Sequence, residues 1–270
     1  MTVKAAYLVP GSPLPYAQGD NPPWRPFVDG FAAAAESLGA SGAETLVVYS
    51  TQWLAVLDQL WLTRPHSAGV HVDENWHEFG ELPFDVHSDT ELTNAVIEST
   101  PAINIRSKGV DYDGFPIDTG TIVTNNLLNG EAGLPLCVTS NNLYHDWDMT
   151  YALGQVVAKS AAAMNRNIAV VGVGGLSGSF FRNTIDIAED HVAEKSDDEW
   201  NQRMLALLED GDCEQIIAAV PDFAQTARVD MGFKHCAFIL GALGSSYQSA
   251  KIHAYGPLYG TGGAIVEFEP

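Results

Sequence analysis

Basic residues are scarce in this sequence: 13 Lys and Arg stand against 34 Asp and Glu, which gives a formal net charge of −21 over 270 residues. A surface with this excess of negative charge repels phosphate backbones and anionic lipids. Nucleic acids and membrane surfaces are therefore poor partners. The acidity is typical of a soluble surface, and we expect a cytoplasmic protein.

Cysteines and long apolar runs are also few. The three cysteines, Cys137, Cys213 and Cys236, form no CxxC pair, which argues against a disulfide framework or a zinc knuckle. The apolar stretch at 5–9 is too short for the core of a signal peptide, and no apolar run reaches 18 residues. We therefore expect neither export nor a membrane-spanning segment.

Short apolar runs alternate with amphipathic stretches along the chain. Strands are predicted at 3–9, 45–49, 134–139, 168–173, 251–255 and 264–268. Helices are predicted around 27–38, 91–98, 148–164, 199–208, 213–220 and 223–243. Capping boxes that begin at Ser88 and Ser196 start two of these helices, and 64–87 and 111–120 are expected to be irregular. The alternation predicts one α/β domain over residues 1–270, with a mostly parallel central sheet, helices on both faces and closing C-terminal strands.

The predicted strand at 168–173 ends in a glycine-rich turn, Gly174-Gly175-Leu176-Ser177-Gly178. Binding sites in open α/β sheets form at the carboxyl ends of strands, so this turn is a candidate site. A GxGxxG motif counted from Gly172 would need a glycine where Ser177 stands, and Ser177 has no evident base beside it. The pattern favours a structural turn, at a place that resembles an active site without its catalytic side chains.

The segment 71–87 gathers five side chains that can bind metals: His71, Glu74, His77, Glu78 and His87. No histidine pair has the i, i+4 spacing of a helical metal site, so a solvated loop is the favoured interpretation. Asp146 and Asp148 precede a predicted helix, where capping and the helix dipole explain both acids. No GxSxG nucleophile motif is present.

Taken together, the predicted strand ends resemble the class III extradiol ring-cleavage dioxygenases, over nearly the whole chain from Tyr7 to Gly262. Within that superfamily, the sequence is most similar to the α subunits of 2-aminophenol 1,6-dioxygenases. The resemblance implies that active members hold Fe(II) with two His and one Glu. It also implies an α2β2 heterotetramer, in which a homologous catalytic β subunit holds the iron.

Two family motifs that supply histidine ligands have no histidine here. The Pro-His-x-Pro motif after the first strand reads Pro10-Gly11-Ser12-Pro13. The Ser-x-His-Trp motif after the second strand reads Ser50-Thr51-Gln52-Trp53. Glycine offers no ligand atom, and a glutamine carbonyl is a weak substitute for imidazole on Fe(II).

Three further motifs have changed in the same way. The family turn Gly-Gly-Leu-Ser-His ends here in Gly178, an Asp-His-Gly loop has Thr119 in place of His, and the Gly-x-Glu motif matches 232–234 with Lys234 at its end. An ammonium group about 4 Å from a divalent ion would repel it by on the order of 8 kcal/mol at an effective dielectric of about 20. The resemblance therefore implies no metal, no cofactor and no catalytic residue in this chain. It implies instead a vestigial pocket at Gly11, Gln52, Gly178, Lys234 and Thr119.

Three functions are compatible with these observations. The first is a non-catalytic, structural or regulatory α subunit of an Fe(II)-dependent 2-aminophenol 1,6-dioxygenase, which opens the ring of aminophenol or chloroaminophenol with O2. The second is a scaffold or binding protein on the same fold. The third is an enzyme with a new metal site around His71, His77 and Glu78. Trp61 and Trp76 are candidates for a subunit interface, where exposed aromatic residues are enriched.

Overall fold

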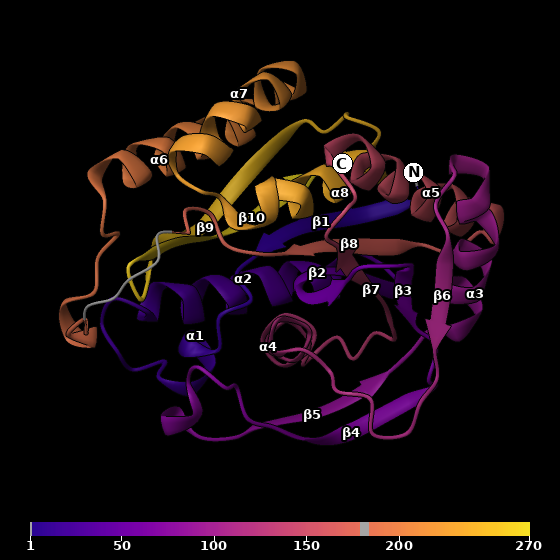
Figure 1. The fold of residues 1–270 in the computed structure, drawn as a ribbon, viewed down its shortest axis with the longest axis horizontal. Helices are drawn as coiled ribbons and strands as arrows, with labels where there is room; N and C mark the ends of the chain where they lie inside the picture. Colours follow the sequence, from indigo (N-terminus) through magenta and orange to yellow (C-terminus); the bar gives the residue numbers. More distant parts are fainter. Residues whose placement is uncertain (1, 179–183) are drawn as a thin grey trace.

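The computed structural model describes residues 2–178 and 184–270. Within these ranges, an eight-stranded sheet of order β6-β3-β7-β2-β8-β1-β10-β9 runs through the middle of the molecule (Figure 1). The pairs β1–β8, β2–β8, β2–β7 and β3–β6 are parallel, whereas β3–β7, β1–β10 and β10–β9 are antiparallel. The strands are β1 (Val3–Val9), β2 (Thr45–Ala55), β3 (Gln59–Leu62), β6 (Ser107–Val110), β7 (Leu136–Asn142), β8 (Ile168–Val173), β9 (Ser249–Leu258) and β10 (Thr261–Glu269).

Strand β8 lies in the parallel core of the sheet. All six of its residues are buried, and it pairs with β1 on one side and β2 on the other. A strand covered on both faces has no need for alternating polar residues, which explains its apolar composition. The predicted α/β architecture, with closing strands at the C-terminus, is confirmed.

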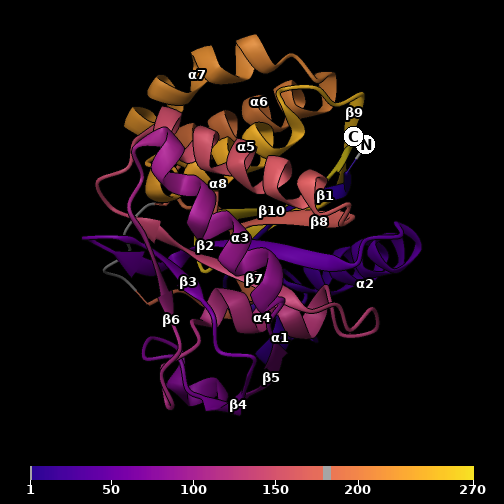
Figure 2. The ribbon, with the colours of Figure 1, turned by 90° about the vertical axis from the view of Figure 1, so that its right-hand side faces the viewer.

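Helices cover both faces of the sheet (Figure 2). One face packs against α3 (Thr90–Ser99), α5 (Trp147–Ala163), α6 (Lys195–Asp210), α7 (Cys213–Thr226) and α8 (Lys234–Leu243). The other face packs against α1 (Leu14–Ala17), α2 (Arg25–Ala40) and α4 (Thr119–Leu127). Beyond α4 lies a small antiparallel sheet of β4 (His66–His71) and β5 (Leu82–His87). Short 3-10 helices are η1 (His77–Phe79), η2 (Thr100–Ile103), η3 (Ile187–Glu189) and η4 (Asp230–Phe233).

Helices α5 and α8 approach each other closely through two glycines. A Cβ atom on Gly154 would lie 2.1 Å from the Phe238 carbonyl oxygen, and one on Gly241 would lie 2.0 Å from the Tyr151 carbonyl oxygen. No side chain fits at such distances, so both positions require glycine. The contact fixes the position of α8, which begins shortly after residues 228–231, which form part of the candidate site.

Several local predictions were wrong. The segment 64–87 is only partly irregular, because residues 66–71 (β4) pair with residues 82–87 (β5). The predicted loop at 111–120 ends in the first turn of α4, and the predicted helix at 223–243 is interrupted at 227–233. Helix α3 is capped by Asp89, whose side chain accepts a hydrogen bond from the Leu92 amide, and not by Ser88.

The predicted caps of α6 and α5 have different outcomes. Helix α6 begins after Glu194, with no side-chain cap at Ser196. Asp146 caps α5, as expected, by accepting a hydrogen bond from the Met149 amide.

Trp61 is fully buried and is therefore excluded as an interface residue. Among the described residues, no helix has the length and hydropathy that a membrane span requires.

Candidate functional site

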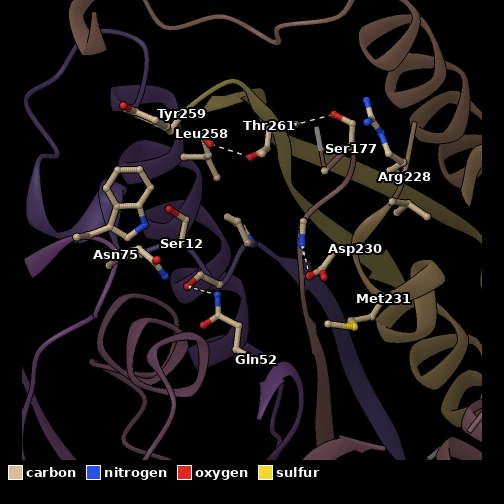
Figure 3. Close-up of a pocket in the computed structure, with 18 of the residues that line it drawn as sticks. Ser12, Gln52, Asn75, Ser177, Arg228, Asp230, Met231, Leu258, Tyr259 and Thr261 are labelled. Carbon is tan, nitrogen blue, oxygen red and sulfur yellow. Dashed lines mark hydrogen bonds between the residues drawn. The ribbon is translucent and has the colours of Figure 1, made fainter. Parts of the chain in front are cut away.

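A cavity of about 620 Å³ opens at the carboxyl ends of β1, β2 and β8 (Figure 3). Gly11 after β1, Gln52 from β2, and Gly175 and Gly178 after β8 contribute to its wall. Three of the parallel strands therefore end at one site, as expected for an open α/β sheet. The segment before α8, which includes Asp230, closes the opposite side.

Gln52 fills the space between the end of β1 and the start of α4. Its Nε2 donates a hydrogen bond of 3.1 Å to the Gly11 carbonyl oxygen. A Cβ atom on Gly11 would lie 2.9 Å from Nε2, and one on Gly120 would lie 3.1 Å from the Gln52 Oε1. The amide group therefore occupies the space that a side chain at either glycine would need.

Asp230 is a cavity residue that the sequence analysis missed. Its Oδ2 accepts hydrogen bonds from the Thr51 hydroxyl at 2.6 Å and from the Gly175 amide at 3.1 Å. Burial raises the pKa of the Asp230 carboxyl group, and these hydrogen bonds oppose the rise. Figure 3 shows Asp230 and Gln52 on opposite sides of the cavity.

The backbone after Asp230 has an unusual conformation. Met231, Gly232 and Phe233 have φ values of 44°, 67° and 65°, all in the left-handed region. Two of the three are not glycine, so the turn carries local strain, which is common at binding sites. In the sequence, the one feature that could have indicated Asp230 as a site residue is its position two residues before the predicted motif at 232–234.

Of the five predicted pocket residues, Gly11, Gln52 and Gly178 line this cavity, whereas Lys234 and Thr119 do not. The Lys234 ammonium donates to the carbonyl oxygens of Asn142 at 2.8 Å and His145 at 3.1 Å, and thereby joins the start of α8 to the end of β7. Burial lowers the pKa of Lys234, although nearby acids oppose this. Three of the five predicted positions therefore share this cavity.

Thr119 lies behind the cavity wall. Its hydroxyl donates to Asp73 Oδ2 at 2.7 Å and lies 2.9 Å from His71 Nε2. Asp73 itself lines the cavity. Thr119 therefore positions a cavity carboxylate without facing the cavity.

The cavity wall contains few strong metal ligands. Among the described residues that line it, Asp73 and Asp230 are the carboxylates, and none is His or Cys. His235 lies close behind the glycine-rich turn, where a Cβ atom on Gly174 would be 2.6 Å from its Nδ1, but it is fully buried and does not line the cavity. The arrangement can form hydrogen bonds with a small polar molecule, but it does not offer the paired imidazoles of a facial triad.

Two clusters in the described part of the chain could hold a metal ion, and neither is the predicted group of His71, His77 and Glu78. One is His71 with Asp73 and Glu74, and the other is His66 with Asp85 and His87. His77 and Glu78 lie in η1 and belong to neither cluster.

Comparisons with known proteins place these observations in a family context. A family model described as the catalytic LigB subunit of aromatic ring-opening dioxygenase matches residues 6–269. The chain is 48% identical over 269 residues to the 2-aminophenol 1,6-dioxygenase alpha subunit of Pseudomonas sp, and the match covers 99% of each chain. It is 23% identical over 273 residues to the 2-aminophenol 1,6-dioxygenase beta subunit of Pseudomonas sp, which covers 93% of this chain and 88% of that one.

Two more distant matches extend over most of the chain. The chain is 20% identical over 235 residues to the 3,4-dihydroxyphenylacetate 2,3-dioxygenase of Escherichia coli, with 86% of this chain and 85% of that one covered. The crystal structure of an uncharacterized protein from Escherichia coli K12 superposes with a TM-score of 0.65 at 14% identity, and covers 98% of this chain and 99% of that one.

Proposed function

This chain belongs to the LigB family of aromatic ring-opening dioxygenases, and we propose that it is the non-catalytic α subunit of an Fe(II)-dependent 2-aminophenol 1,6-dioxygenase. The assembly opens the ring of an aminophenol or chloroaminophenol with O2, in the cytoplasm, and this subunit has a structural or regulatory role. Its own metal site is degenerate, and the iron belongs to the β subunit.

The set of donor atoms around the cavity supports this proposal. A non-haem iron centre of the facial-triad type takes two imidazoles and one carboxylate. Here Gln52 uses its amide nitrogen to hold the Gly11 carbonyl oxygen, and no imidazole occurs among the described lining residues. Burial favours the protonated form of Asp230, which binds metals poorly. These residues do not fit an Fe(II) centre, and we assign no chemical step to them.

The proposed partner is a homologous β subunit in an α2β2 heterotetramer. The similarity to both the alpha and the beta subunit of one dioxygenase supports a pairing of two related chains. In this proposal, the fold of the α chain is retained because its surface binds the catalytic chain.

An exposed apolar patch suits such a contact. The patch lies at the carboxyl ends of β2 and β7, where the Leu143 amide donates to the Ala55 carbonyl oxygen at 2.9 Å and holds the two segments side by side. Leu57 is 77% exposed and Tyr144 is 79% exposed, and contiguous exposed apolar patches commonly mark protein–protein contacts. We propose that the patch, which comprises Leu54, Val56, Leu57, Leu143 and Tyr144, binds the β subunit.

The proposal is tested by comparing β-subunit preparations with and without this chain. We expect ring-opening activity to require the β subunit and to rise when both chains are coexpressed. The variant Gln52→Ala of this chain should leave kcat of the complex within about twofold, because a side chain that takes no part in chemistry contributes nothing to the barrier. A loss of kcat of about a hundredfold in that variant would show that the cavity takes part in the reaction.

A further inference from the structure

The small β4–β5 sheet brings His66 next to Asp85, which is 19 residues later in the sequence, and next to His87 on the same strand as Asp85. The two strands are antiparallel, and their register places His66 opposite His87 and Ala68 opposite Asp85. Side chains two residues apart on a strand share a face, so Asp85 and His87 lie on the same side. Directly opposed residues also share a face, which adds His66 to this group.

The donor atoms of these residues converge. His66 Nε2 lies 2.8 Å and His87 Nε2 lies 3.3 Å from the same oxygen, Asp85 Oδ1. The two imidazole rings are stacked, with centroids 4.4 Å apart and an angle of 14° between their planes. One donor atom from each of the three residues lies within 4.8 Å of the others.

These distances are close to those of a coordinated ion. Ligands about 2.0–2.1 Å from a tetrahedral zinc ion are separated from one another by about 3.3 Å. The two nitrogen–oxygen distances in the cluster, 2.8 Å and 3.3 Å, are close to this value, and both imidazole rings must turn out of their near-parallel stack for their nitrogens to point at one ion. An ion bound there would replace the hydrogen bond between His66 Nε2 and Asp85 Oδ1 and the 3.3 Å contact between His87 Nε2 and the same oxygen.

The cluster is accessible and its backbone is held in place. The side chains of His66, Asp85 and His87 are 50%, 67% and 69% exposed, so an ion can reach them from solvent. Asn125 on α4 donates to the Asp85 carbonyl oxygen at 3.1 Å and thereby anchors the strand. The nearest guanidinium group along the chain, that of Arg64, forms an ion pair with Asp113 at 2.8 Å.

The second cluster is less suited to an ion. Asp73 already accepts hydrogen bonds from the Thr119 hydroxyl and the Asn75 amide, and His71 contacts the same hydroxyl. A metal ion there would have to displace these partners. Within the described residues, by contrast, the His66 side chain hydrogen-bonds only to Asp85, and the His87 side chain contacts the same carboxylate oxygen at 3.3 Å.

We propose that His66, Asp85 and His87 form a binding site for a divalent late first-row transition metal ion, for which Zn²⁺ is the probe. Two imidazoles and one carboxylate are ligands that Zn²⁺ commonly takes, and three protein ligands leave a position for water. The site lies on the β4–β5 sheet, and none of its three residues lines the cavity described above. The proposed α-subunit function and this site are therefore independent.

The test is calorimetric titration of the tag-free, chelator-treated chain with ZnCl2. We expect one saturable site, weakened at least tenfold by His66→Ala and by His87→Ala, since each removes one of three ligands. His77→Ala is the matched control, because it removes an exposed imidazole from the same segment without touching the cluster. That variant should keep the affinity of the parent chain, and circular dichroism should show that all variants are folded.

A second measurement identifies the ligands. Electron paramagnetic resonance of the Cu²⁺-loaded chain should show coupling to two imidazole nitrogens, and to one in His87→Ala. The absence of saturable Zn²⁺ binding by the parent chain would overturn the proposal. It would be overturned equally if His71→Ala abolished binding while His87→Ala did not, because the ion would then occupy the second cluster.

Discussion

His235 lets the pH dependence of stability be predicted from one side chain. It lies on α8, is fully buried, and neither ring nitrogen has a hydrogen-bond partner among the described residues. Burial lowers the pKa of His235 from its ordinary value of 6.5 to about 3. The imidazole is therefore neutral in the folded chain at pH values well above 3.

The sign of the effect follows from proton linkage. Between pH 6.5 and pH 3 the unfolded chain binds a proton at this residue and the folded chain does not, so stability decreases as the pH decreases through this range. From pH 7 to pH 5, protonation of the unfolded state alone lowers the free energy of unfolding by about 2 kcal/mol. The result depends little on the folded-state pKa as long as that pKa stays below about 4.

Urea unfolding of the parent chain and of His235→Leu at pH 7 and pH 5 measures this contribution. Leucine has a similar volume and does not titrate, so the variant should lose about 2 kcal/mol less than the parent over this interval, while all other groups titrate alike in both. His191→Leu, at an exposed position, should behave as the parent does. Equal acid-induced losses in the parent and in His235→Leu would refute the reasoning.

Two other predictions concern packing and assembly. Gly241→Ala should lower the free energy of unfolding, measured in urea, by roughly 1–3 kcal/mol, because the added Cβ would lie 2.0 Å from the Tyr151 carbonyl oxygen. In the control Gly39→Ala, the added Cβ meets no atom within 4 Å, so the free energy of unfolding should rise by about 0.5–1 kcal/mol. If Gly241→Ala is as stable as the parent, the close α5–α8 contact is wrong. Leu57→Asp should lower the affinity for the β subunit at least about a hundredfold and abolish coelution with it, because the substitution buries an unpaired charge in the proposed interface. Ile217→Asp on α7, at another exposed apolar position, should leave coelution unchanged. Unchanged coelution of Leu57→Asp would place the interface elsewhere.

The parallel core of the sheet was predictable because its sequence pattern has one physical cause. Strand β8 is apolar throughout because it is buried on both faces. Strand β4 was missed because most of its side chains are exposed. Strand β5 does alternate apolar residues, with Leu82 and Val86 buried, but the pattern is only six residues long and contains Pro83.

Helix α4 was missed for a related reason. Its first residues, Thr-Gly-Thr-Ile-Val-Thr, are β-branched except for the glycine and have low helix propensity. The cap provides the missing stabilisation, because Asp118 accepts hydrogen bonds from the amide and the hydroxyl of Thr121. Burial of the whole first turn adds to it.

The same contrast applies to the candidate site. Gly11, Gln52 and Gly178 could be placed from the sequence because the ends of neighbouring parallel strands meet at one edge. Lys234 and Thr119 stand at the first residues of helices, where the direction of the side chain depends on how the chain enters the helix. Asp230 depends on the left-handed turn that follows it, which no sequence pattern indicated.

The most direct test of the proposed function is the iron content and the 2-aminophenol ring-opening activity of three preparations: this chain alone, the β subunit alone and the coexpressed pair. We predict no iron and no turnover for this chain alone, and one iron per αβ pair with full activity for the coexpressed complex. Any Zn²⁺ bound at His66, Asp85 and His87 is counted separately in the same elemental analysis. Stoichiometric iron in the isolated chain, with ring-opening turnover, would contradict the assignment of a non-catalytic subunit.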